Sequence, residues 1–157
     1  MPLAGVLGDV TALHGRYYAR AWSFPITFEA KVAREMAEFL ARYDPARDVL
    51  LSAVVGERVV ASVTIDGSDP LLPVGLAHLR WFVVDAALRG QGVGKRLLAE
   101  AVGFARKAGF AGIYLTTFRG LEAAAALYAA AGFRVVAEEM GESWGREVVE
   151  QRMEVWF

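Results

Sequence analysis

Three glycines alternate with other residues in one short stretch of the sequence, at residues 88–98. This stretch, LRGQGVGKRLL, lies between an apolar, β-prone segment at residues 79–84 and a segment with helical periodicity. Glycines at positions 90, 92 and 94 keep side chains away from a ligand, and the first amides of a helix have no partner within it. Such amides, at the positive end of a helix dipole, bind anions. We interpret the stretch as a diphosphate-binding loop, surrounded by three basic residues: Arg89, Lys95 and Arg96.

Two better-known phosphate-binding loops do not fit this spacing. The dinucleotide-binding fingerprint requires a third glycine three places after the second, where this chain has Lys95. The P-loop requires four residues between its glycines and a serine or threonine after its lysine. Here Gly90 and Gly94 are too close together, and Arg96 follows the lysine. A tight strand-to-helix turn without a ligand remains the alternative interpretation.

The segment RGQGVGK, at residues 89–95, resembles the pyrophosphate signature of the GNAT superfamily of N-acetyltransferases, which bind acetyl-coenzyme A. A second segment, AAALYAAAGF at residues 124–133, resembles the closing helix of that superfamily with its Tyr-x-x-x-Gly-Phe ending. The resemblance covers residues 76–133 most firmly. The chain is also similar to the acetyltransferase half of proteins that fuse a MarR-type regulator to a GNAT domain. No helix-turn-helix half is present, so nothing supports nucleic acid as a partner.

The resemblance implies an α/β (α+β) fold. The expected architecture is a mixed central sheet of six to seven strands flanked by about four helices, with a splay between the fourth and fifth strands. In the superfamily, amides of the splayed strand bond the pantetheine arm and the thioester oxygen. The implied cofactor-binding residues are Phe82, Val83, Val84, Arg89, Gly90, Gln91, Gly92, Val93, Gly94, Lys95, Thr117 and Tyr128. Many members carry an asparagine where this chain has Leu121, which weakens any side-chain contact there.

Acetyl transfer to an amine requires a neutral nitrogen, a polarised thioester and a proton for the departing thiolate. Tyr128 occupies the position of the proton-donating tyrosine in the resemblance, and an ordinary phenol is protonated at neutral pH. A ring that simply packs in the core is the alternative. For the general base we name His78, on the strand at residues 75–84, although a strand histidine is more often structural and a water chain would also serve. Direct transfer without an acyl-enzyme is the simpler mechanism.

The amino-terminal third is where the resemblance places the acceptor site. Residues 1–9 are poorly patterned and could begin a first short strand running to His14. A helical segment then carries Tyr17 and Trp22, which we name as weak candidates for substrate contacts, while packing of these aromatics against the sheet is the favoured alternative. Thr27 is a plausible N-cap for a helix at residues 28–43. His14 and Glu29 also fall in this region.

Segments at 49–55 and 59–65 predict a β-hairpin, and residues 75–84 predict a strand with His78, Arg80, Phe82 and Val84 on one face. Residues 113–117, 134–140 and 148–156 predict further strands, and residues 120–131 predict a helix that ends at Gly132. The apolar last strand, ending at residues 155–157, could pair across a homodimer.

Composition limits the remaining possibilities. A chain of 157 residues with 55% hydrophobic residues is expected to form one folded domain over residues 1–157. The net charge of −1 and the lack of long apolar runs give no sign of a nucleic-acid or membrane partner, and the cytoplasm is the expected compartment. The absence of cysteine excludes disulfides and a cysteine nucleophile, and we expect no metal.

Three functions therefore remain under consideration. The first is an acetyl-coenzyme A-dependent N-acetyltransferase acting on a primary amine of a small molecule or peptide. The second is an acyl-coenzyme A-binding or sensing domain without turnover. The third is a nucleotide-binding α/β domain that uses the glycine loop for another diphosphate.

Overall fold

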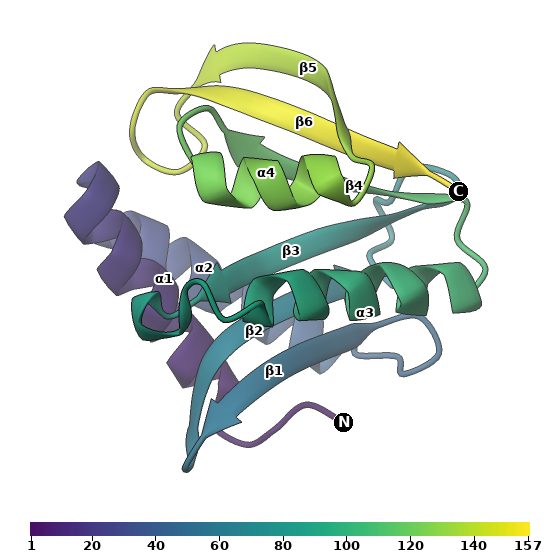
Figure 1. The fold of residues 1–157 in the computed structure, drawn as a ribbon, viewed down its shortest axis with the longest axis horizontal. Helices are drawn as coiled ribbons and strands as arrows, with labels where there is room; N and C mark the ends of the chain where they lie inside the picture. The colour runs from purple at the N-terminus through teal and green to yellow at the C-terminus, as the bar shows by residue number, and fades with distance from the viewer.

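A six-stranded mixed sheet forms the centre of the molecule, with helices on both faces (Figure 1). The computed structural model describes all of residues 1–157. The strand order is β1-β2-β3-β4-β6-β5, and every neighbouring pair is antiparallel except β3–β4. The strands are β1 (Val49–Val55), β2 (Arg58–Asp66), β3 (Leu76–Val84), β4 (Gly112–Phe118), β5 (Arg134–Gly141) and β6 (Val148–Trp156). The helices are α1 (Val6–Trp22), α2 (Ile26–Ala41), α3 (Val93–Lys107) and α4 (Glu122–Ala130), with a short 3₁₀ turn η1 (Ala86–Leu88) before α3.

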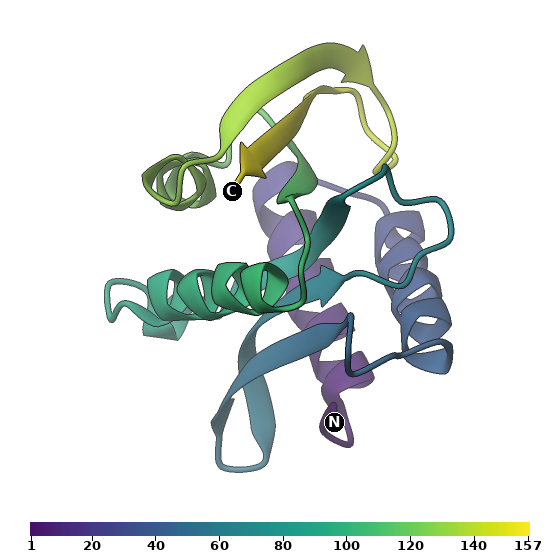
Figure 2. The same ribbon diagram turned by 90° about the vertical axis from the view of Figure 1, so that its right-hand side faces the viewer.

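The helices divide between the two faces of the sheet, as Figure 2 shows edge-on for α3 on one side and α1 with α2 on the other. The apolar stripes that the sequence pattern predicts for α2 and α3 are buried in the structure, because residues three and four apart share one helix face. One buried cluster joins α3 and α4 to the sheet, and a second joins α1 and α2 to the opposite face.

The sheet opens between β3 and β4. These parallel strands pair only through Leu76–His78 and Gly112–Tyr114, so the remaining six residues of β3 and four of β4 have no partner across the gap. Each strand stays bonded to its other neighbour. This confirms the splay implied by the family resemblance, although it falls between the third and fourth strands of this chain.

The splay lies one strand earlier in chain order than expected, because the amino-terminal segment is a helix and not a strand. Residues 6–22 form α1, so the prediction of a first short strand there is wrong. Val6, Val10 and His14 form its buried stripe, at helical rather than alternating spacing. Helix α2 begins two residues earlier than expected, after Pro25 rather than Thr27, and no side chain caps it.

A β-bulge in β3 changes the predicted facing of that strand. Ser62 pairs with Val83 and Thr64 with Arg80, so two residues of β3 stand opposite the single residue between them in β2. Trp81, in the bulge, has a φ of 50°, which is rare for a bulky residue, and its carbonyl accepts a hydrogen bond from the Ser62 hydroxyl at 2.9 Å.

The bulge makes the predicted alternation wrong after Arg80. Phe82 and Val84 pack with the α3 cluster, whereas Trp81 and Val83 pack with the α1–α2 cluster. An extra residue in one strand exchanges the two faces for every residue that follows it.

None of the helices combines the length and the apolar composition needed to cross a bilayer.

Candidate active site

The glycine-rich loop ends in a row of unpaired amides. The backbone N–H groups of Gly92, Val93, Gly94 and Lys95 donate no hydrogen bond within the protein. The first amide of α3 that donates one is that of Arg96. Gly90 and Gly92 have φ values of 80° and 77°, so the loop bends through a conformation that favours glycine. A Cβ added at either glycine would meet no atom within 4 Å, so the loop faces open space.

Gly94 has a different role from the other two glycines. It is buried in the first turn of α3, where an added Cβ would lie 3.2 Å from Phe82, 3.3 Å from Leu127 and 3.4 Å from Val84. Its missing side chain lets α3 start close against β3 and α4. The loop amides are thereby placed directly beside the open part of the sheet.

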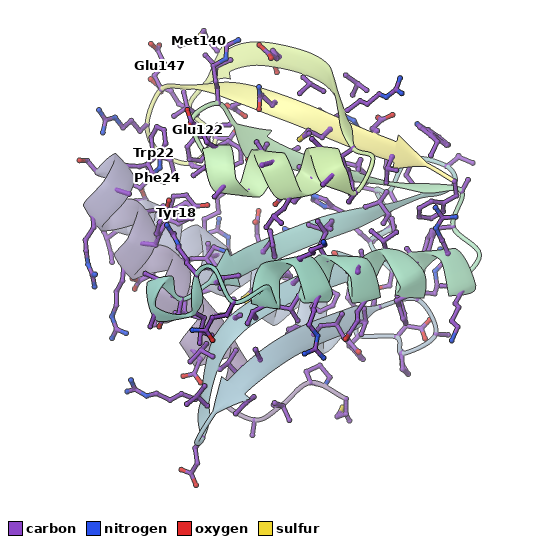
Figure 3. The ribbon with its side chains drawn as sticks, viewed as in Figure 1. Tyr18, Trp22, Phe24, Glu122, Met140 and Glu147 are labelled. Atoms are coloured by element: carbon purple, nitrogen blue, oxygen red, sulfur yellow. The ribbon has the colours of Figure 1, made fainter.

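A groove of about 550 Å³ runs from this loop into the splay. Its walls come from the loop, from β3 at Phe82, Val83 and Val84, and from α4 between Leu121 and Leu127. Figure 3 shows Glu122 at the start of α4 beside the aromatic end of α1, where Tyr18 lies. Arg89 and Lys95 also line the groove, so the end of the groove at the glycine-rich loop carries positive charge.

A second cavity of about 350 Å³ adjoins the groove, and Tyr18, Phe82, Leu121 and Ala124 line both. Its aromatic wall includes Phe28, Phe118 and Trp144. Its charged and polar lining includes His14, Lys31, Glu35, His78, Arg80, Thr116, Thr117, Ser143 and Glu150. The two cavities are therefore neighbours, and the second also reaches side chains of α1 and α2.

Tyr128 stands on the wall of this second cavity. Its ring is buried, with the ring of Phe82 5.7 Å away and that of Phe133 5.8 Å away. Burial raises the pKa of its phenol well above the ordinary value, because the charged phenolate would be desolvated, and nearby Tyr18 adds to this effect. The phenol therefore keeps its proton throughout the neutral range.

An acetyl-coenzyme A site fits this geometry. Free amides at the start of a 15-residue helix match a diphosphate, and the gap beside β3 leaves strand amides without a β4 partner for a pantetheine arm. A model of the acetyltransferase (GNAT) family matches residues 13–133. The chain belongs to the GNAT family. Its members use acetyl-coenzyme A as acyl donor, and this chain is an acetyl-coenzyme A-dependent acyltransferase.

Solved GNAT structures share the fold of this chain. A ribosomal-protein-alanine N-acetyltransferase from Brucella melitensis superposes with a TM-score of 0.77 at 19% identity, covering 99% of this chain and 97% of that one. A protein assigned as a streptothricin acetyltransferase from Bacillus anthracis, solved with acetyl coenzyme A, gives 0.62 at 21% identity over 76% and 68%. A GNAT acetyltransferase from Streptococcus pneumoniae gives 0.67 at 16% identity over 96% and 95%. No curated protein matches the sequence of the chain.

The groove beside the glycine-rich loop contains most of the residues predicted to hold the cofactor. Phe82, Val83, Val84 and the loop from Arg89 to Lys95 lie along it, except Gln91. Gln91 is exposed, and its side-chain amide donates to the Ala87 carbonyl at 3.4 Å. Thr117 is buried and lines the second cavity rather than the groove.

His78 also lines the second cavity, but its surroundings are unfavourable for a base. Its ring stacks on Tyr114 with centroids 4.3 Å apart. Burial, together with the positive charge of Arg80, lowers the pKa of the imidazole to about 3. The bulge also places His78 on the face of the sheet opposite to Phe82, so the expectation that the two share a face is wrong.

The two residues named as candidates for substrate contacts, Tyr17 and Trp22, lie outside the second cavity. Tyr17 lines the groove beside the glycine-rich loop, where the Arg89 guanidinium lies 5.3 Å from the ring centroid of Tyr17. Trp22 packs edge-on against Phe118 at 4.7 Å, and Figure 3 shows it beside Phe24 at the end of α1. Of the aromatic cluster, Tyr18 reaches both cavities instead.

Several residues that line the second cavity were not predicted as site residues from the sequence. They come from α2, from β3 and from the β5–β6 hairpin: Phe28, Lys31, Glu35, Arg80, Ser143, Trp144 and Glu150. Glu150, Arg152 and Glu154 occupy alternate positions of the last strand, so a charged face on that strand could be recognised from the sequence. Only the tertiary fold brings that face next to α2.

Proposed function

We propose that the chain transfers the acetyl group of acetyl-coenzyme A to a primary amine of a small molecule or peptide, by direct attack of the amine within the second cavity. The observation that carries this proposal is that the two cavities adjoin, with four residues lining both. The donor would lie along the groove beside β3, and the acceptor would enter from the α1–α2 face. The family match supports the donor, and the position of the second cavity beside the groove supports the placement of the acceptor.

Each part of the proposed site has a role for residues of this chain. The amides of Gly92 to Lys95 would bind the diphosphate, with Arg89 and Lys95 adding positive charge. Amides of β3 that face the gap would hydrogen-bond the thioester oxygen as negative charge develops there, which is a large contribution to many enzymes. These donors are already fixed by the pairing of β3 with β2.

Tyr128 is proposed as the general acid. In the reaction the C–N bond forms and the C–S bond breaks, and the departing thiolate takes the phenolic proton. The nitrogen loses one proton as the amide forms, and this proton returns to the Tyr128 phenolate through water. A phenol that is protonated throughout the neutral range is ready for the first of these steps.

Two further proposals concern the surroundings of the enzyme. Residues of β5 are exposed along almost the whole edge strand, and Trp156 and Phe157 are also exposed, which supports a homodimer formed through this end of the sheet. The supply of acetyl-coenzyme A inside cells supports action in the cytoplasm.

Tyr128→Phe tests the proposed function directly. We expect turnover, measured as thiol release in the presence of an amine panel, to fall by about 100-fold, because general acids contribute roughly 10²–10⁴ in rate. Acetyl-coenzyme A should still raise the melting temperature of the variant as it does for the unchanged protein. Unchanged turnover would remove Tyr128 from the mechanism, and thiol release from no amine at all by the unchanged protein would contradict the proposed function.

A further inference from the structure

The ion pairs around the second cavity leave one carboxylate without a cationic partner. Glu35 accepts from Lys31 at 2.6 Å and from Arg80 at 3.1 Å. Arg80 also donates to the buried Asp66 at 3.1 Å. The two cations on the cavity wall are therefore both paired, and so is Glu35. Glu150 is the other carboxylate on that wall, and it forms no salt bridge within the chain.

Glu150 is held in place without being neutralised. The Ser143 hydroxyl donates to one of its oxygens at 2.6 Å, and the Ser143 amide donates to the other at 3.2 Å. Both donors come from the loop between β5 and β6, and Gly141 leaves the space that the side chain occupies. Two neutral donors orient the carboxylate and leave its negative charge available for a cation.

The position of Glu150 in the sheet directs it to the acceptor side. Glu150 pairs with Phe118 across β4 and β6, and directly opposed residues of antiparallel strands share one face. Phe118 belongs to the cluster on the α1–α2 face. Glu150 therefore lies on the face from which the acceptor would enter, and it shares the cavity with Tyr128.

We propose that Glu150 binds the ammonium group of the acceptor and takes its proton, and that the acceptor is a primary amine on an aromatic or apolar body without a carboxylate beside the amine. This inference rests on the proposed function. The histidines of the cavity are neutral, so neither attracts an ammonium group by charge. The aromatic wall of Phe28, Phe118 and Trp144 suits an aromatic or apolar body. A carboxylate next to the amine would meet Glu150 and find no unpaired cation on the wall.

The acceptor nitrogen loses two protons in the proposed reaction. The Glu150 carboxylate accepts one proton from the ammonium and releases it to water, and the neutral nitrogen then attacks the thioester carbon. The thiolate that leaves takes the Tyr128 proton, and the second proton lost by the nitrogen returns to the Tyr128 phenolate through water. One acetylated amine, one free thiol and one solvent proton result.

Other charged and titratable groups surround this carboxylate. From α1, α2 and β3, His14, Lys31, Glu35, His78 and Arg80 line the same cavity, and on β5 Glu139 pairs with Glu150. On β6 itself, Arg152 lies two positions further along, where its guanidinium covers the Tyr114 ring. The phenols of Tyr18 and Tyr128 keep their protons, because burial raises the pKa of each.

The test compares Glu150→Gln with Glu147→Gln. Glu147 lies on the same hairpin, at the outer turn that Figure 3 shows near Met140, and it is exposed and does not line the cavity. The assay is thiol release with acetyl-coenzyme A and 2-phenylethylamine. We expect Glu150→Gln to lower kcat/KM for the amine by roughly 100-fold at neutral pH, with the KM for acetyl-coenzyme A and the melting temperature unchanged, and Glu147→Gln to behave as the unchanged protein.

The pH profile separates this role from a structural one. As the pH rises toward the amine's own pKa of about 10, solution supplies neutral amine and the deficit of Glu150→Gln should shrink. A deficit that is equal at every pH, or no deficit at all, would overturn the role of Glu150 while leaving acetyl transfer itself intact.

The acceptor class is tested on the unchanged protein. We expect kcat/KM for 2-phenylethylamine to exceed that for phenylalanine at least tenfold, because phenylalanine carries a carboxylate beside its amine. Equal or better use of phenylalanine, or turnover of neither compound by a protein that acetylates other amines, would overturn the class. Thiol release from no amine would instead contradict the proposed function.

Discussion

His14 illustrates how a single buried side chain couples this fold to pH. Its ring is 5% exposed, and its Nδ1–H donates to the Val10 carbonyl at 2.8 Å one helical turn earlier. Desolvation lowers the pKa of the imidazole from 6.5 to about 4, which outweighs the opposing effect of that hydrogen bond. His14 is thus neutral under ordinary conditions.

The lowered pKa of His14 predicts acid-sensitive stability. The unfolded chain takes up a proton near pH 6.5, whereas the folded chain does so only near pH 4, so stability is complete above 6.5 and is lost as the pH falls through the folded value. We expect the free energy of unfolding of the unchanged protein to fall by about 3 kcal/mol more than that of His14→Gln between neutral pH and about pH 4. Urea unfolding at a series of pH values measures this difference.

His78 shifts in the same direction and remains in both proteins, so only the difference between the two curves reports His14. Parallel curves for the unchanged protein and His14→Gln would contradict the assignment of a depressed pKa to His14.

At the scale of elements, the start of α3 is the feature that couples packing to ligand binding. Gly94 and Gly103 are both helical glycines of α3, yet an added Cβ is crowded at Gly94 and meets nothing within 4 Å at Gly103. The two positions therefore form a matched pair for one substitution.

We expect Gly94→Ala to weaken acetyl-coenzyme A binding and to lower the melting temperature, because the methyl group pushes α3 away from β3 and α4. Gly103→Ala should leave binding unchanged and stabilise the protein by about 0.4–1 kcal/mol, since alanine restricts the unfolded chain. Calorimetric titration with acetyl-coenzyme A and thermal unfolding measure both effects. Equal affinities for the two variants would show that the position of α3 does not control the donor site.

Elements with strong local signals were predictable from the sequence. The hairpin of β1 and β2, the apolar stripe of α3 and the end of α4 at Gly132 follow from alternation, helical spacing and a glycine at φ 96°. The glycine-rich loop was also predictable, because its glycines directly precede a helix and the first amides of a helix have no partner within it.

The bulge at Trp81 and the helix α1 were not predictable in this way. A bulge leaves no mark on composition, yet it moves Phe82 to the opposite face from His78. In α1 the stripe of Val6, Val10 and His14 is short and partly polar, so its helical spacing gave only a weak signal. The second cavity was also not predictable, because its walls come from α1, α2, β3, β4, α4 and the β5–β6 hairpin.

At the scale of the whole molecule, the sheet has two halves that pair with each other only at one end of β3 and β4, while the buried cluster under α3 and α4 packs across both. Three residue pairs join the strands of the two halves, and the two adjoining cavities lie beside the unpaired part. A ligand in this gap would replace the missing strand contacts. The central claim is therefore that the gap and the amides of Gly92 to Lys95 bind acetyl-coenzyme A together.

Residue-resolved hydrogen exchange with and without coenzyme A tests that claim most directly. In the free protein the amides of Gly92, Val93, Gly94 and Lys95 lack acceptors and should exchange rapidly. Saturating coenzyme A should slow these amides and the gap-facing amides of β3 beyond His78, while the paired amides of the β1–β2 hairpin stay unchanged as an internal reference. Binding of coenzyme A with protection elsewhere, and none from Gly92 to Lys95, would contradict the account.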